Sequence, residues 1–226
     1  MASSNFIGRL LRRHLPITRS RGAVLKKFAK KIGLVYFGVV DQHIDEHDVI
    51  RGLTVSTTHV DDHYTVGAYD GYDVSLVDRF DIVVDRHNVS SEHTWTILRL
   101  NLDKSEALPH LFLYPLGQKT KAYNKFFEAT HHLQVVNSLF QGAHSQEFHN
   151  RYSIYTSSSH ALSLEELLTP TVTQTIAATL WPHAIEILDN KLYLYIIETK
   201  LSETLLETGL SSVLWLARVL EQTEEN

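Results

Sequence analysis

The chain has 226 residues, of which 43% are hydrophobic and 21% charged, and its formal net charge is −5 at pH 7. It has no cysteine, which excludes disulfides, iron–sulfur clusters, thiolate zinc sites and cysteine nucleophiles. The composition is that of a globular protein with enough apolar material for one large domain or two small lobes. The longest apolar runs are far shorter than the roughly 20 residues that span a bilayer, so we expect a soluble or peripherally attached protein.

The basic residues gather at the N-terminus. No Asp or Glu precedes Asp41, so all 26 acidic residues lie in the rest of the chain. The basic residues of the first 33 positions are Arg9, Arg12, Arg13, Arg19, Arg21, Lys26, Lys27, Lys30 and Lys31. We call residues 1–33 the basic head and the rest of the chain the acidic body. A separation of charge of this kind predicts that the head binds an anionic partner.

Residues 1–21 are predicted to form a basic amphipathic segment with a helix that ends before Pro16. The residues that we expect to contact a membrane or a partner are Phe6, Ile7, Leu10 and Leu11 on the apolar side and Arg9, Arg12 and Arg13 on the basic side. This pattern suits an anionic membrane surface or an acidic protein. A targeting segment and a solvated tail are the alternatives, whereas the acidic body disfavours nucleic acid.

A second helix is predicted over residues 22–32, with Gly33 as its C-cap. Its apolar stripe is Val24, Leu25, Phe28, Ala29 and Ile32, and its lysines are Lys26, Lys27, Lys30 and Lys31. The continuity of this stripe with the apolar residues that follow indicates that the helix packs on the domain.

Most of the following elements are predicted strands. Residues 34–40 are a short apolar run, and residues 63–85 form a hairpin that turns at Asp70-Gly71. Beyond that turn, apolar and polar residues alternate, which predicts one buried face and one wet face. Further strands are predicted in TWTILRLNL, LFLYP, LQVV and RYSIYT, and a second hairpin turns at Asp189-Asn190.

Helices are predicted over residues 118–130, after Thr169-Pro170, and over residues 203–220 after Ser202. We therefore predict an α+β fold, with two lobes of mainly antiparallel sheet and packed helices. The domain spans residues 22–222, with lobes of about 22–116 and 117–222. The order helix–strand–hairpin occurs in both lobes, which either an internal duplication or coincidence explains.

The segments that carry a resemblance to known proteins are FAKKIGL, VGAYDGYDVSLV, LFLYP, EFHNRYSIYT, LLTP and IEILDNKLYLY. Through them the sequence resembles a large group of uncharacterised bacterial proteins that have an N-terminal helix followed by a two-part α+β domain. The resemblance covers most of residues 23–198 and supplies no catalytic residue. It implies attachment to a membrane, because some members carry N-terminal apolar helices. This chain departs from that pattern, because it has a basic amphipathic segment in their place.

Residues 41–63 hold four histidines and six acidic residues. Residues 43–47 spell H-x-x-E-H, a zinc peptidase pattern in which two histidines one helical turn apart bind the metal. HVDDH at residues 59–63 repeats the spacing. The set for a divalent metal such as zinc would be His43, Glu46, His47, His59 and His63. The flanking residues are typical of strand and loop, so we favour a solvated loop and no cofactor.

The sequence has no G-x-S-x-G elbow, no phosphate-binding loop and no dinucleotide fingerprint. We therefore expect a non-catalytic binding or scaffold module, attached through its N-terminal helix to an anionic membrane surface or an acidic partner. The rival hypothesis is a metal-dependent hydrolase that uses residues 41–63. We expect a cytoplasmic location, at the inner membrane face, or an organelle if the source is eukaryotic.

Overall fold

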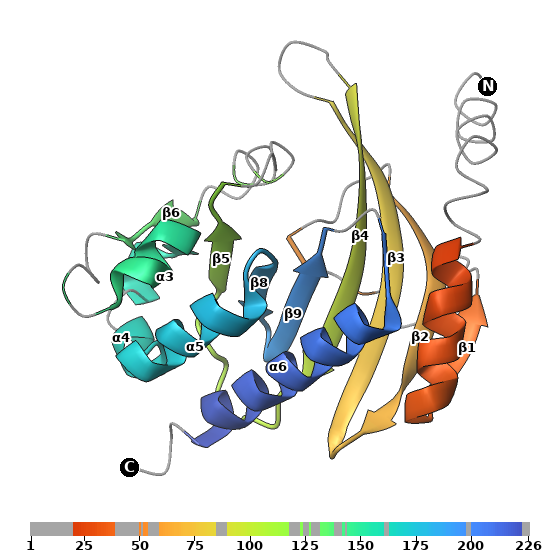
Figure 1. Ribbon diagram of the computed structural model, residues 1–226. Helices are drawn as coiled ribbons and strands as arrows, with labels where there is room; N and C mark the ends of the chain where they lie inside the picture. Colours follow the sequence, from red (N-terminus) through yellow and green to blue (C-terminus); the bar gives the residue numbers. More distant parts are fainter. Residues whose placement is uncertain are drawn as a thin grey trace.

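The computed structural model describes residues 20–38, 50, 52–53, 59–84, 90–117, 123, 127, 132–137, 142, 144–160, 163–197 and 200–222. Nine strands form one antiparallel sheet in the order β1-β2-β3-β4-β9-β8-β5-β7-β6 (Figure 1). Their bounds are β1 Val35–Gly38, β2 Val60–Tyr69, β3 Tyr72–Val84, β4 Ser90–Asn101, β5 Leu111–Pro115, β6 Gln134–Val135, β7 Tyr152–Thr156, β8 Ala184–Leu188 and β9 Lys191–Ile196. The predicted α+β class with a largely antiparallel sheet is confirmed.

The sheet is continuous through both predicted lobes. β4 pairs with β9 over six residue pairs, Thr96↔Ile196 to Asn101↔Lys191, which joins the two halves. β5 precedes the predicted boundary near residue 116, yet it pairs with β7 and β8, which follow that boundary. The strands β1–β4 stand in chain order, whereas the other half has the order β9-β8-β5-β7-β6.

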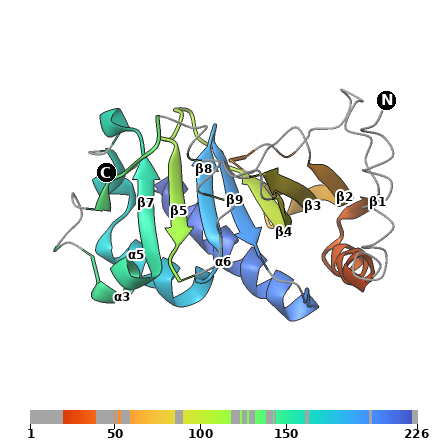
Figure 2. The ribbon, with the colours of Figure 1, turned by 90° about the horizontal axis from the view of Figure 1, so that it is seen from above.

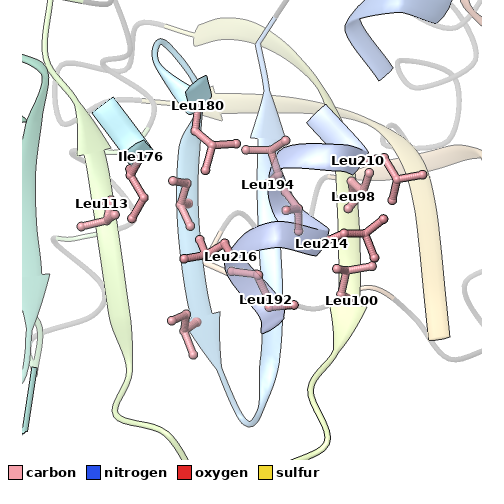
Figure 3. Close-up of a cluster of buried hydrophobic side chains, with 14 of the residues drawn as sticks. Leu98, Leu100, Leu113, Ile176, Leu180, Leu192, Leu194, Leu210, Leu214 and Leu216 are labelled. Carbon is pink, nitrogen blue, oxygen red and sulfur yellow. The ribbon is translucent and has the colours of Figure 1, made fainter. Parts of the chain in front are cut away.

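Five helices of the described chain pack on one face of this sheet. They are a helix over residues 20–32, α3 Gln146–Arg151, α4 Ser163–Leu167, α5 Pro170–Leu180 and α6 Glu203–Gln222, with a short 3-10 helix η2 at Ser158–His160. Figure 2 shows the helix over residues 20–32, α3, α5 and α6 on that side. We call this side the helix-covered face. Its core is mainly leucine and isoleucine, and Figure 3 shows Leu210, Leu214 and Leu216 of α6 among side chains from the strands below.

The other side of the sheet is an aromatic face. Its buried aromatic residues are Tyr64, Trp95, Phe112, Tyr123, Tyr193 and Tyr195. Ile50, Leu53 and Leu133, which belong to segments outside the sheet strands, are buried in the same cluster. Both faces are therefore buried over much of the sheet, and the prediction of a wet face along β3 is wrong: Ser75, Arg79 and Asp81 are all nearly inaccessible.

Local sequence signals set the turns and helix ends. Asp70, Gly71, Asp189 and Asn190 all have positive φ angles between 51° and 86°, as two-residue hairpin turns of type I′ require. Both predicted hairpins are therefore confirmed. Thr169 caps α5 by accepting from the Val172 N–H.

The helix over residues 20–32 ends in a Schellman motif. Gly33 has a φ of 81°, and the Leu34 N–H bonds the Ala29 carbonyl at 2.9 Å. The predicted apolar stripe of this helix faces the sheet: Leu25, Phe28 and Ala29 are buried, and Val24 and Ile32 pack against the same core. The helix therefore packs on the domain as predicted, next to β1 and β2 at one edge of the sheet (Figure 1).

Candidate functional site

The first turn of the helix over residues 20–32 is fixed to the sheet by a buried cation. The Arg21 guanidinium is 2% exposed and donates to both carboxylate oxygens of Asp78, at 2.8 and 3.0 Å. It also donates to the Thr96 hydroxyl at 2.6 Å, and that hydroxyl donates to Asp78 at 2.6 Å. Such a planar, bidentate pair sets the direction of the chain as well as its position. One of the nine basic residues of the head is thus structural.

The lysines of this helix divide into two groups. Lys27 and Lys31 reach α6, where they bond Glu203 and Glu207 at 2.6 Å each. The bond to Glu207 raises the pKa of Lys31 above its usual value. Lys26 and Lys30 are exposed, and the Lys26 ammonium stands 6.0 Å from the centre of the Tyr36 ring. Lys26 and Lys30 are four residues apart, so they share one side of the helix.

The predicted membrane- or partner-binding residues lie outside the described residues. They are Phe6, Ile7, Arg9, Leu10, Leu11, Arg12 and Arg13. The described chain begins at Ser20, one residue before the Arg21 anchor. The helix that begins at Ser20 packs next to β1 and β2 at one edge of the sheet.

Of the predicted metal set, His43, Glu46 and His47 also lie outside the described residues, and the structure places only His59 and His63. His59 directly precedes β2 and His63 lies within that strand, at an irregularity where its φ is 58°, so the two are not one helical turn apart. The His63 ring stacks on Tyr36, whose hydroxyl lies 2.8 Å from His63 Nδ1. A Cβ atom on Gly22 would overlap the His63 ring. His63 therefore packs beneath the N-terminal helix.

The aromatic face contains a second buried ion pair. Arg79 on β3 donates to both carboxylate oxygens of Asp61 on β2, at 2.7 and 2.6 Å, and to the carbonyl oxygen of Ile50 at 2.5 Å. The Arg79 side chain has no exposed area and that of Asp61 is 6% exposed. The pair ties Ile50, which is outside the sheet, onto the aromatic face.

Glu186 on β8 is the centre of a further polar cluster on the same face. Its carboxylate is fully buried and accepts from the Tyr195 hydroxyl, from the Leu53 N–H at 2.7 Å and from His110 Nε2 at 2.7 Å. Burial raises the pKa of Tyr195 well above its usual value, and the Glu186 charge adds to this, so Tyr195 stays protonated and donates. A Cβ at Gly52 would overlap the Tyr195 hydroxyl, which explains a glycine there.

His110 connects this buried cluster to the surface. Its Nδ1 lies 3.2 Å from Nε2 of His132, which is exposed. The sequence pattern points to the pair His131-His132 as a candidate member of a histidine cluster, but to neither His110 nor Glu186. The available signal was a lone acidic residue within the apolar strand AIEIL, since Glu is almost never fully buried without a partner.

A hollow of about 310 Å³ opens between the β4–β5 connection and α4. Lys104, His160, Ser163, Glu166 and Leu220 are among its lining residues. The His160 Nδ1 atom bonds Ser157 at 3.0 Å, and Ser157 does not line the hollow. The lining mixes one lysine, two glutamates, a histidine and a serine with apolar side chains, and this mixture indicates no ligand class.

The part of the chain that the structure describes holds neither a cluster of metal ligands nor a membrane-spanning helix. The described residues contain no group of three or more His, Cys, Asp or Glu side chains arranged to hold a metal ion. None of the helices found among them is long and apolar enough to cross a bilayer. The metal prediction for residues 41–63 stays a prediction, because three of its five residues lie outside this part of the chain.

The comparisons with known proteins bear on the fold. No family model matches the sequence, and no curated protein does. The structure is similar to the crystal structure of the mycobacterial trehalose monomycolate transport factor A, TtfA, with a TM-score of 0.59. The match covers 91% of this chain and 96% of that chain at 15% sequence identity. A likeness at this identity shows a shared α+β fold and nothing finer.

Proposed function

We propose that the protein is a non-catalytic binding or scaffold module that is held at an anionic membrane surface by its N-terminal segment. Phe6, Ile7, Leu10 and Leu11 would enter the interface between headgroups and acyl chains, and Arg9, Arg12 and Arg13 would pair with lipid phosphates. On this proposal the module works at the cytoplasmic face of the membrane, where anionic lipids attract basic segments.

The anchoring of the helix over residues 20–32 is the observation that carries the proposal. Because Asp78 and Thr96 bind Arg21, the chain is attached firmly to the sheet directly after the N-terminal segment. Lys26 and Lys30 of this helix are exposed, and the Lys26 ammonium lies 6.0 Å from the centre of the Tyr36 ring on β1. On this proposal both lysines add to the attraction between the N-terminal cations and an anionic surface. Each cation near an anionic leaflet contributes about 1 kcal/mol, which makes the sum of several decisive.

The buried polar groups of the aromatic face support a non-catalytic role. Arg79 and Asp61 satisfy each other, and the Glu186 carboxylate is occupied by three donors. These bonds attach Ile50 and Leu53 to the sheet. A buried charge used in this way stabilises one arrangement of the chain.

The test is flotation of the protein with liposomes of neutral or anionic lipid. The full chain should float with anionic vesicles only, and added salt should release it. The truncated form should begin at Ser20, because removal of Arg21 would break the buried pair with Asp78 and confuse lost binding with lost folding. That form, residues 20–226, should lose most of the binding.

A matched pair of variants separates exposed from paired lysines. Replacing Lys26 and Lys30 by Ala should weaken binding about 30-fold, since two cations near the surface contribute about 2 kcal/mol. The control replaces Lys27 and Lys31, whose charges Glu203 and Glu207 already balance, and should change binding less. Equal flotation of the full chain and residues 20–226, or no flotation of either, would overturn the membrane proposal.

A further inference from the structure

The sheet topology brings two histidines from distant parts of the chain to one place. β5 and β6 lie on either side of β7, and both run antiparallel to it. Leu111 at the start of β5 and Gln134 at the start of β6 both pair with Thr156. The residues just before these strands therefore meet at the same end of the sheet. His110 directly precedes β5 and His132 lies two residues before β6, and the two are 22 residues apart in sequence.

Glu186 fixes which nitrogen of His110 carries the proton. The carboxylate already accepts from the Tyr195 hydroxyl and the Leu53 N–H, so it is also the acceptor toward His110 Nε2. The Nε2 atom is then the donor, and in the neutral ring the lone pair is on Nδ1. That lone pair faces His132 Nε2 at 3.2 Å. The Nδ1 atom of His110 is thus oriented toward the Nε2 atom of the exposed His132.

From this geometry we propose that His110 Nδ1 and His132 Nε2 bind a divalent transition-metal ion such as Zn²⁺ or Cu²⁺. This site is separate from the predicted set in residues 41–63 and does not depend on membrane attachment. In the metal-free form the two nitrogens share a hydrogen bond. In the bound form the ion replaces this hydrogen bond, the His132 proton moves from Nε2 to Nδ1 through solvent, and water completes the coordination on the exposed side of His132.

Two features of the site match metal–histidine chemistry. Zinc–nitrogen bonds are about 2.0–2.1 Å long, so two nitrogens on a tetrahedral zinc ion lie about 3.4 Å apart. The 3.2 Å separation of Nδ1 and Nε2 needs little adjustment to reach that value. Histidine ligands also commonly donate their other ring N–H to a carboxylate, which orients the ring. Glu186 makes that bond from a fully buried position, at 2.7 Å.

The experiment is a titration of the metal-free full chain with Zn²⁺, Cu²⁺ and Mg²⁺, followed by calorimetry and by NMR of the imidazole signals. We expect one saturable event per chain for Zn²⁺, a tighter one for Cu²⁺, and none for Mg²⁺, because imidazole ligands favour the later transition metals. The His110 and His132 signals should shift together at one equivalent. Uptake of Zn²⁺ without a one-to-one event would overturn the site.

Two variants distinguish this site from general uptake by the 14 histidines of the chain. His132→Gln should abolish the one-to-one event and still fold, since the side chain is exposed. His160→Gln is the matched control, because His160 is also exposed and its Nδ1 atom bonds Ser157, and this variant should bind zinc as the original chain does. Identical isotherms for the two variants would show that the binding is adventitious and would end the proposal.

Glu186→Gln tests the role of the buried carboxylate. The loss of a carboxylate behind a metal-bound histidine typically lowers affinity 10- to 100-fold, and we expect a fall in that range. Circular dichroism before titration verifies that the variant folds. Unchanged zinc affinity in folded Glu186→Gln would contradict the oriented-ligand arrangement, whereas the His132→Gln result stands independently of it.

Discussion

The two faces of the sheet are buried by different means. On the helix-covered face, apolar side chains of the helix over residues 20–32 and of α5 and α6 pack on leucines and isoleucines of the strands. On the aromatic face, tyrosines, a tryptophan and two charged centres, Arg79–Asp61 and Glu186, hold single residues of loop segments against the strands. Area and shape dominate the first arrangement, apart from the Arg21–Asp78 pair that anchors the helix over residues 20–32. The second depends on bonds between particular atoms.

This difference shows which face of the sheet requires particular residues at particular positions. Apolar packing tolerates exchange of one hydrophobic residue for another of similar volume. A buried carboxylate or guanidinium tolerates no such exchange, because each lost partner leaves a desolvated charge. The candidate metal site at His110 and His132 stands on the aromatic face, where positions are fixed by direction as well as by volume.

The largest effect is expected from Arg79→Met on the aromatic face. The change leaves the Asp61 carboxylate buried without its guanidinium, and it should lower the free energy of unfolding by about 3–5 kcal/mol. Urea unfolding measures the difference. The double variant Arg79→Met/Asp61→Leu should recover most of the loss, since an apolar pair removes the uncompensated charge. A single variant that costs under about 1 kcal/mol would contradict the contrast between the faces.

A smaller loss is expected from Leu194→Ala on the helix-covered face. Leu194 is fully buried, and its Cδ2 atom leaves only 3.1 Å for a Cβ added at Gly209 of α6, so the strand and helix are in close contact. The cavity should lower the free energy of unfolding by about 3 kcal/mol. Val135→Ala is the control, because Val135 is 53% exposed, and it should change the value by under about 0.5 kcal/mol. Similar losses in both would refute the assignment of Leu194 to the core.

The smallest effect concerns acid sensitivity at His183. Burial lowers the pKa of this imidazole to about 4, so the folded protein holds it neutral where an unfolded chain would bind a proton. Its contribution to stability is fully present above about pH 6.5 and is lost as the pH falls toward 4, with about 2 kcal/mol gone at pH 5.

Unfolding by urea at several pH values measures this dependence. His183→Gln cannot titrate, so its curve of unfolding free energy against pH should be flatter between pH 6.5 and 4 than that of the original chain. Parallel curves for the two proteins would mean that other groups account for the loss in acid.

Local sequence alone determined several features of the fold. Asp70-Gly71 and Asp189-Asn190 specified both hairpins because few residues adopt positive φ without strain. Thr169-Pro170 and Ser202 specified the starts of α5 and α6, where their side chains accept N–H bonds. The stripe from Val24 to Ile32 specified which side of the N-terminal helix packs on the domain. Each of these signals depends on residues that are close together in the sequence.

Only the tertiary structure decided what the polar residues of the strands do. The alternation along β3 predicted that Arg79 and Asp81 face water, because a period of two cannot show that loop segments cover the second face. The same limit applies to Glu186, whose partners His110, Leu53 and Tyr195 are separated from it by 76, 133 and 9 residues. The pairing of His110 with His132 depends on β5 and β6 both flanking β7, and strand order is a property of the whole sheet. Sequence therefore determined the hairpin turns, the starts of α5 and α6 and the inward side of the N-terminal helix, while long-range pairing decided which charged groups are buried together.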